Sequence, residues 1–328
     1  MRLVLLGDVM LGRLVNDGLR SRPVEFPWGD TMDFLKSADA SVCNLECVIS
    51  DRGVPWEPAR KAFHFRTDSK NIEVLKKASI TAVTLANNHT LDFGAEALAD
   101  TLSSLDASGI KRAGAGIDFG DASRPAYFKA GGVDVALISF TDNEPDWEAK
   151  EKTPGVYYLP VDLKDPRAAM LLDMIGEAKK RAELVIVSPH WGPNRGYRPV
   201  PIHIPFAHAM IDAGADIVFG HSCHVFQGVE LYRGRPIIYS AGDFIDDYAV
   251  DEVERNDESF VFILETEGAR LRRLLLYPTM IIRFQARAAS GFLAEDIAIK
   301  MKNLSSEFKT KLKWLEEECC LELFLAQQ

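Results

Sequence analysis

The sequence predicts an α/β protein with mixed β-sheets. Short runs of β-branched and other apolar residues alternate with stretches of helical period along most of the 328 residues. Segments 133–140 and 259–278 are apolar and contain strands joined by short glycine-containing turns without a helix, which predicts hairpins. The hydrophobic content of 47% is sufficient for one large core.

The predicted elements follow one another in a regular order. Each predicted strand ends in an abrupt polar cluster; the six strands are 2–6, 40–44, 80–86, 183–188, 215–219 and 236–241. Helices are predicted over 94–109, which ends in a capping glycine, and over 166–182, which begins with proline. From residue 281 the pattern predicts two further helical segments. We therefore expect one main domain, 1–280, and a C-terminal helical extension, 281–328, packed on it.

Charge and composition exclude some classes of partner. The net charge of −10 and the isoelectric point near 5.3 argue against nucleic acid, because such binding depends on clustered Lys and Arg. The five cysteines do not form the even framework of a small secreted protein. An apolar run of only four residues precedes Gly7, too short for a signal peptide, and no apolar run approaches membrane-spanning length. These features predict a cytoplasmic protein without a membrane segment.

The polar residues after the predicted strands form the candidate site. Loops at the carboxyl ends of strands converge at one edge of an open α/β sheet. The residues collected there are Asp8, Glu46, Asn87, Asn88, His89, Asp92, His190, His221, His224 and Asp243. Neutral imidazoles and carboxylates suit divalent ions such as Zn, Mn, Fe or Co. The pattern thus predicts a catalytic metal site.

Each of these residues also has a simpler interpretation. Asp8 alone could cap a helix, the NNH segment at 87–89 could form a turn, and His190 could be a hydrogen-bonded core residue. The metal site is favoured because five strand ends carry ligand-type residues at once. His64, His203 and His208 have no convergent partners in the pattern, and no ligand role is predicted for them.

With these residues, the chain resembles the CapA-type poly-gamma-glutamate (capsule) synthesis family, a branch of the calcineurin-like metallophosphoesterases. The matching stretches run in family order from Gly7 to Asp251 and read GDVMLGR, NLE, LANNHTLDFG, SPHWGPN, GHSCHVFQGVE and IIYSAGDFIDDYAVD. The resemblance implies a four-layer α/β/β/α sandwich, with two mixed sheets inside, helices outside and a site for two divalent metal ions at one edge.

The resemblance also implies roles for individual residues. The implied metal ligands are Asp8, Glu46, Asn88, His190, His221 and His224. Asp8 and His224 would bind the first metal, Glu46 would bridge, and the other three would bind the second metal. His89 would be a general acid or would stabilise the transition state, oriented by Asp92.

Three departures from the wider superfamily pattern affect these assignments. Met10 stands where the superfamily has the histidine of an Asp-x-His motif, Glu46 replaces a bridging Asp, and the two histidines of GHSCH are three residues apart instead of two. Met10 removes one imidazole from the first metal position, and the changed spacing makes the assignment of His224 weaker than that of His221.

Three arginines are candidates for binding an anionic substrate. Arg13 follows the first motif, and Arg195 and Arg198 follow His190. Guanidinium groups bind phosphate and carboxylate through paired hydrogen bonds, although surface arginines also serve solubility. The three residues therefore suit either an anionic small molecule or an anionic polymer.

Three functions are compatible with this site. The first is a metal-dependent hydrolase of the phosphoesterase type. The second is a non-catalytic, polymer-binding accessory component of capsule (poly-gamma-glutamate) synthesis, and the third is a metal-dependent amide hydrolase acting on glutamyl links. The apolar C-terminal segment would pack on the domain or form a homo-oligomer through the C-terminal helices.

Overall fold

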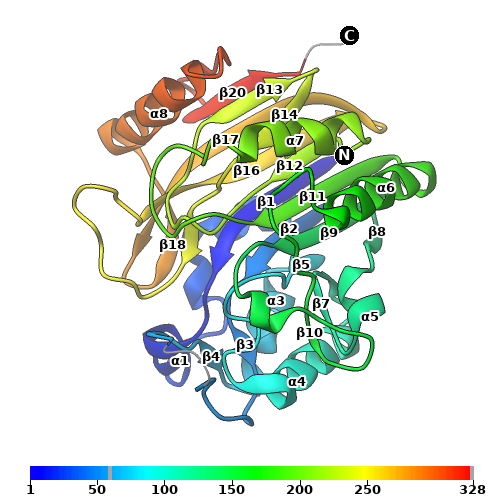
Figure 1. The fold of residues 1–328 in the computed structure, drawn as a ribbon. Helices are drawn as coiled ribbons and strands as arrows, with labels where there is room; N and C mark the ends of the chain where they lie inside the picture. Colours follow the sequence, from blue (N-terminus) through cyan, green and yellow to red (C-terminus); the bar gives the residue numbers. More distant parts are fainter. Residues whose placement is uncertain (58–60, 326–328) are drawn as a thin grey trace.

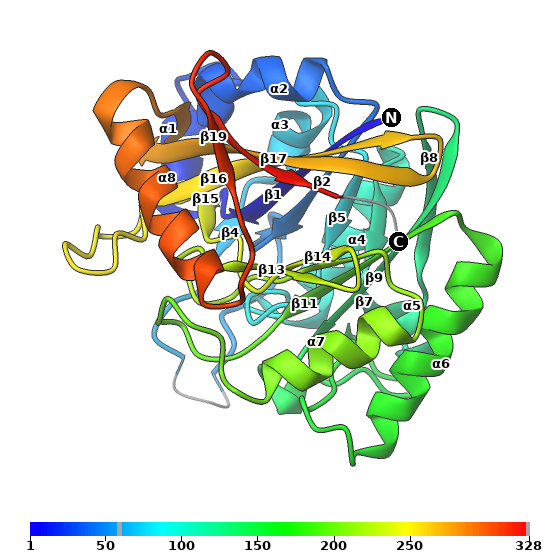
Figure 2. The same ribbon diagram turned by 90° about the horizontal axis from the view of Figure 1, so that it is seen from above.

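Two β-sheets lie face to face between two layers of helices in the computed structural model, which describes residues 1–57 and 61–325 (Figure 1). Figure 2 shows α2 and α3 on the outer side of the larger sheet and α6 and α7 on the outer side of the smaller one. The predicted four-layer α/β/β/α class with two mixed sheets is therefore confirmed.

The larger sheet has ten strands. Its main order is β19-β20-β17-β16-β1-β2-β5-β6, and β15 and β18 pair with β1 and β17. The bounds are β1 Arg2–Val9, β2 Ala40–Leu45, β5 Ala82–Thr84, β6 Lys111–Ala113, β15 Asp243–Ile245, β16 Glu258–Glu267, β17 Arg270–Ile282, β18 Gln285–Ala288, β19 Lys313–Leu315 and β20 Cys320–Phe324. Strands β1, β2, β5, β6 and β15 pair in parallel, and the other pairs are antiparallel.

The smaller sheet has six strands in the order β13-β14-β12-β11-β9-β8. Their bounds are β8 Ala126–Ala130, β9 Val133–Thr141, β11 Leu184–His190, β12 Ile217–Phe219, β13 Val229–Tyr232 and β14 Arg235–Ile238. The central four strands are parallel, and a hairpin closes each edge. Two short strand pairs lie outside both sheets: β3 Val48–Ile49 is parallel to β4 Arg66–Thr67, and β7 Ala115–Gly116 is antiparallel to β10 Gly155–Val156.

Eight α-helices complete the fold in the described part of the chain. They are α1 Arg13–Leu19, α2 Met32–Lys36, α3 Ile72–Lys77, α4 Gly94–Ala107, α5 Phe119–Ser123, α6 Pro166–Arg181, α7 His203–Asp212 and α8 Gly291–Ser306. The predicted helices over 94–109 and 166–182 correspond to α4 and α6. None of the helices among the described residues is long and apolar enough to cross a membrane.

Alternation along the strands divides the core into three layers. In β1, Leu3 and Leu5 face the smaller sheet, whereas Val4 and Leu6 face the outer helices. In β11, Leu184 and Ile186 face the larger sheet and their neighbours face α6 and α7. Successive side chains of a strand point to opposite faces, so strands that are buried on both faces read as continuous apolar runs.

The C-terminal segment differs from the prediction. The first predicted helix is α8, which packs against the end of the core between the sheets through residues such as Ile297 and Met301. The second predicted helix was wrong: this segment forms β19 and β20, and β20 pairs with β17. Leu321, Leu323 and Leu325 are buried with the period of a strand, and the acidic run before them is a turn. The predicted boundary at residue 280 falls inside β17.

Candidate metal centre

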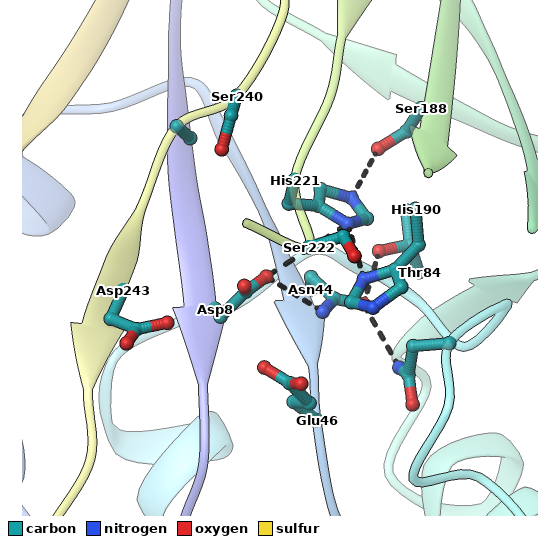
Figure 3. A network of polar contacts seen from close by, with 12 residues as sticks. Asp8, Asn44, Glu46, Thr84, Ser188, His190, His221, Ser222, Ser240 and Asp243 are labelled. Atoms are coloured by element: carbon teal, nitrogen blue, oxygen red, sulfur yellow. Dashed lines mark hydrogen bonds and ion pairs between the residues drawn. The ribbon is translucent and has the colours of Figure 1, made fainter. Parts of the chain in front are cut away.

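Parallel strands of both sheets bring their carboxyl ends to one place. Asp8 on β1 is the register partner of Asn44 on β2 and of Asp243 on β15. On the smaller sheet, His190 ends β11 and forms a β-bridge with His221, which follows β12. Figure 3 shows Asp8 between Asp243 on one side and the two imidazoles on the other, with Glu46 facing the same space.

The first ligand cluster contains Asp8, His190 and His221, and all three side chains are buried. The Nδ1 atoms of the two imidazoles lie 2.9 Å apart, and His221 Nδ1 lies 3.8 Å from Asp8 Oδ1. His221 Nε2 lies 2.9 Å from the Ser188 hydroxyl, which fixes the ring orientation. A contact of this kind on the far nitrogen is typical of metal-binding histidines.

Asn88 borders this first cluster. It follows β5, and its Oδ1 lies 3.0 Å from His190 Nε2. The Asn88 amide oxygen therefore lies beside the His190 imidazole. The resemblance assigns both residues to the second metal. The ligand role of Asn88 stays a prediction.

The second ligand cluster contains Asp8, Glu46, His224 and Asp243. His224 Nδ1 lies 2.8 Å from Asp243 Oδ1. Asp8 belongs to both clusters, whereas Glu46 belongs only to this one. Asp8 is therefore common to the two clusters, and the bridging role that the resemblance implies for Glu46 stays a prediction.

Met10 takes no part in either cluster. Its side chain is buried in the core between the larger sheet and the outer helices, and its sulfur accepts a hydrogen bond of 3.0 Å from the Gly12 amide. The residue that the superfamily pattern would place in the first metal position is thus a core residue in this chain.

The carboxylates of the second cluster are arranged for a cation. Asp8 Oδ2, Asp243 Oδ2 and both Glu46 oxygens are buried, and none of them has a hydrogen-bond partner among the described residues. Burial raises the pKa of Asp8 to about 6, although His224 and the Asn44 amide oppose the shift. The pKa values of Glu46 and Asp243 are raised well above their ordinary values by burial and by neighbouring carboxylates. A divalent cation would satisfy these atoms and reverse the shifts, so the residues fit a metal.

The imidazoles are also suited to binding metal. Burial lowers the pKa of His221 to about 3 and that of His190 well below its ordinary value. Both rings are therefore neutral at pH 7, with lone pairs for a cation. Metal binding requires neutral imidazole, so this burial favours it.

A buried amide network holds Asp8 in place. Asn44 donates a hydrogen bond of 2.8 Å to Asp8 Oδ1, and its own oxygen accepts bonds from Thr84 and Asn87, each at 3.0 Å. Asn87 Oδ1 accepts from the His89 amide at 3.0 Å. Asn87 is therefore a structural residue of the turn, and Asn44 is a supporting residue that the sequence analysis missed. Its position near the end of β2, two residues before Glu46, was the available signal.

His89 lies at the edge of the second cluster and is held by Asp92. His89 Nδ1 lies 2.5 Å from Asp92 Oδ2, and its Nε2 lies 3.8 Å from Glu46 Oε1. The ring stacks on Phe65, with 3.9 Å between centroids, and the Phe65 amide donates to Asp92 Oδ2 at 2.6 Å. Burial lowers the pKa of His89 to about 4 against the opposing effect of Asp92. The proton therefore lies on Nδ1, and Nε2 faces the cluster.

Lys61 completes this arrangement through a contact with Asp92 that the sequence did not predict. Its ammonium lies 2.9 Å from Asp92 Oδ1 and 3.6 Å from Glu144, and it also donates to the Asn88 carbonyl. The side chain is only 10% exposed and lies over the Trp147 ring at 4.4 Å. Lys61 is distant in sequence from the strand ends, so local sequence offered no signal for this contact.

The predicted arginines lie in three different environments. A cavity of about 280 Å³ beside His224 and Tyr248 is lined by Arg195. Arg13 pairs with Asp247 at 3.3 Å, and its guanidinium lies over the Phe63 ring. The structure does not bring Arg198 to the site: its guanidinium donates two hydrogen bonds, of 2.8 and 2.7 Å, to Glu307 next to α8. The guanidinium of Arg198 therefore already has its hydrogen-bond partner on the surface, and a substrate role for Arg198 is not supported.

The remaining histidines have structural partners. His203 stacks on Trp191, His208 pairs with Glu230 at 2.9 Å, and His64 Nε2 lies 3.0 Å from the Trp56 carbonyl. None of the three belongs to a ligand cluster among the described residues.

The family model and the sequence relatives that match this chain agree on one family. The sequence model of the family described as "Bacterial capsule synthesis protein PGA_cap" matches residues 2–248. The chain is 34% identical over 320 residues to a probable polyglutamine synthesis accessory protein of Mycobacterium tuberculosis (strain ATCC 25618 / H37Rv), covering 92% of this chain and 82% of that protein. It is 34% identical over 243 residues to the PGA biosynthesis protein CapA of Bacillus subtilis (strain 168), covering 74% of this chain and 62% of that protein.

Among solved structures, a hypothetical protein from Thermus thermophilus is similar in fold. The TM-score is 0.52 at 19% sequence identity, covering 85% of this chain and 98% of that chain. At this identity the likeness concerns the fold alone.

Proposed function

The chain belongs to the bacterial capsule synthesis protein PGA_cap family, and we propose that it is a metal-dependent hydrolase of the phosphoesterase type acting on an anionic substrate. One observation carries the proposal: two ligand clusters share Asp8, and the buried carboxylates of one cluster have oxygens without partners among the described residues. A structural role for these acids would require hydrogen-bond donors around them.

The proposed ligands follow from the two clusters. Asp8 would bridge two divalent ions, with Glu46 and His224 at one position and with Asn88, His190 and His221 at the other. The chemistry that such a pair supplies is activation of a water and polarisation of the substrate oxygens. The mixture of imidazole, amide and carboxylate ligands suits Mn, Fe, Zn or Co.

His89 is the proposed catalytic residue beside the reacting group. Asp92 holds the proton on Nδ1, so Nε2 points toward Glu46 and the cluster. An anionic phosphoester next to Nε2 would favour the protonated imidazole, because a nearby negative charge stabilises the charged form. The ring can then stabilise developing charge or give a proton to the leaving oxygen.

The cavity beside His224 is the proposed approach for the substrate. Arg195 lines it and offers a guanidinium to an anionic group, as phosphate and carboxylate recognition requires. Acidic residues Asp251 and Glu254 also line this cavity. The substrate is accordingly expected to present its anionic group toward Arg195 and the metal positions.

The first test is metal analysis combined with an ester panel. Protein purified without chelator should hold about two divalent ions per chain, and the loaded protein should hydrolyse phosphomonoesters or phosphodiesters. Metal content is measured by elemental analysis and turnover by release of phosphate or alcohol. Bound metal without turnover on any ester or glutamyl amide would contradict the hydrolase and favour binding of an anionic polymer; release of a glutamyl amide alone would favour the amide hydrolase.

Replacing Lys61 with methionine is expected to lower turnover roughly tenfold while leaving metal content unchanged. The ammonium makes a charge-assisted contact with Asp92, and such contacts are worth about 1.5 kcal/mol, which corresponds to that factor. Without it, Asp92 is less firmly placed as the partner of His89. The measurement is kcat on the best ester. The matched control is Lys129→Met, which removes an exposed pair with Asp134 and should leave kcat unchanged; equal activity of both variants would contradict the positioning role.

A further inference from the structure

We propose that Asp243 is a ligand at the metal position formed by Asp8, Glu46 and His224. This position is therefore oxygen-rich and takes a hard divalent ion such as Mn²⁺ or Mg²⁺. The position of His190 and His221 takes a borderline ion such as Zn²⁺. The inference rests on the proposed metal centre and concerns a strand-end residue to which the resemblance assigns no ligand role.

The backbone sets Asp243 beside Asp8. Strand β15 pairs in parallel with β1, with Asp243 opposite Asp8, and the Asp8 amide donates to the Gly242 carbonyl at 3.1 Å. A Cβ at Gly7 would collide with the Gly242 carbonyl oxygen, so this approach requires glycine at position 7. Figure 3 shows the Asp8 and Asp243 side chains on adjacent strands, with Glu46 close by.

The side chain of Asp243 has an oxygen available for a cation. Asp243 is 0% exposed, and its Oδ1 lies 2.8 Å from His224 Nδ1. Its Oδ2 is buried and has no hydrogen-bond partner within the described part of the chain. Ligand atoms of Asp8, Glu46, His224 and Asp243 all lie within 4.8 Å of one another. One cation can therefore contact all four groups.

The ligand composition makes the two positions chemically different. The position with Asp243 has three carboxylates and one imidazole, which is the donor set of hard cations. The position of His190 and His221 has two imidazoles, the bridging Asp8 and the Asn88 amide oxygen. Imidazole ligands favour Zn²⁺ over Mn²⁺ and Mg²⁺. Each position thus prefers a different ion.

A two-step titration tests the inference. The protein is first loaded with one equivalent of Zn²⁺ and is then titrated with Mn²⁺, with bound Mn²⁺ counted by electron paramagnetic resonance. The wild type should bind about one Mn²⁺ per chain. Asp243→Asn retains an oxygen for His224 but removes the charge, and its affinity for that Mn²⁺ should fall at least about tenfold, with Zn²⁺ content unchanged.

Two control variants separate ligation from general effects. Asp216→Asn makes the same charge change at a buried carboxyl that pairs with Lys179 and Arg235 and belongs to neither cluster, and it should keep its Mn²⁺ affinity within about threefold of the wild type. Met10→Leu changes a core residue of similar volume and should also keep it. Equal weakening by Asp216→Asn and Asp243→Asn would show a general charge effect and would overturn the assignment.

A second measurement requires no variant. X-ray absorption of the wild type carrying Zn²⁺ and Mn²⁺ should show about one imidazole at Mn and about two at Zn. Unchanged Mn²⁺ affinity in Asp243→Asn, or two imidazoles at Mn, would show that Asp243 serves only as the hydrogen-bond partner of His224. Absence of bound metal in the wild type would overturn the metal centre itself, whereas two bound ions without ester hydrolysis would overturn the proposed activity and leave this inference standing.

Discussion

Turnover by the His89→Ala variant is expected to be about 100 to 10,000 times lower than that of the wild type, the usual range for loss of a general acid or base. The metal content should be unchanged, because His89 belongs to neither ligand cluster and lies 3.8 Å from Glu46 at its nearest approach to the carboxylates of those clusters. The measurement is kcat on the best ester, together with elemental analysis of the same sample.

Two controls make this result specific. His208→Ala removes a histidine that pairs with Glu230 and stacks on Tyr232 away from the clusters, and it should retain full turnover. His89→Gln keeps a side chain of similar length against Phe65 and should be as inactive as His89→Ala, which excludes loss of packing as the cause. Loss of metal together with activity in either His89 variant would show that His89 is a ligand.

The strand ends could be predicted from sequence because their signals are local. The continuous apolar run before Asp8 marks a strand buried on both faces, and the abrupt change to polar residues marks its end. The same change precedes His190 and His221. Since parallel strands share an edge, collecting the residues after each run was enough to assemble most of both clusters.

The contacts that sequence reasoning missed join distant segments. Asp243 was collected as a strand-end residue, yet its place beside Asp8 follows from the pairing of β15 with β1, which are far apart in the sequence. Lys61 reaches Asp92 from a segment outside both sheets, and Arg198 is satisfied by Glu307. No local pattern specifies such partners.

The wrong helix near the C-terminus has a different cause. Leu321, Leu323 and Leu325 alternate as a strand, but the acidic run before them resembles a helical surface. The pairing of β20 with β17 stabilises the strand, so tertiary contacts override the local preference.

Removing metal is expected to lower the melting temperature, and the loss should grow as the pH rises above about 6.5. Glu46 and Asp243 have pKa values raised well above normal by burial and by neighbouring carboxylates. An acid whose pKa is higher in the folded than in the unfolded state stabilises the protein at low pH and loses that contribution as the pH rises through the folded pKa. The metal-free protein must therefore ionise buried, adjacent carboxylates to remain folded at alkaline pH.

Bound cations remove this cost by pairing with the ionised carboxylates. Metal binding displaces protons, so it stabilises the fold more at higher pH, and a ligand at about 1,000 times its Kd contributes about 4 kcal/mol. For a chain of this size that corresponds to a shift of roughly 6 °C. The measurement is the melting temperature with metal and with chelator at several pH values between about 6.5 and 9.

The buried histidines determine how the stability of the metal-free protein changes on the acidic side of this pH range. Burial lowers the pKa values of His190 and His221, so their contribution to stability is present above the unfolded value near 6.5 and is lost as the pH falls toward the folded one. The histidines increase stability as the pH rises, whereas the carboxylates decrease it. Well above the histidine pKa of the unfolded state, the contribution of the histidines no longer changes with pH. Stability of the metal-free protein should consequently pass through a maximum near neutral pH.

The Glu46→Gln variant tests this explanation, because its effect on the melting temperature should have opposite signs with chelator and with metal. In chelator at a pH of about 8.5, this variant should melt at a higher temperature than the wild type, because a neutral amide replaces a buried carboxylate whose two oxygens have no partner among the described residues. With saturating metal it should melt at a lower temperature, because one ligand charge is missing. A chelated wild type that melts at the same temperature as the loaded one at this pH would contradict a metal centre at Asp8, and a variant that is less stable under both conditions would assign Glu46 a packing role instead.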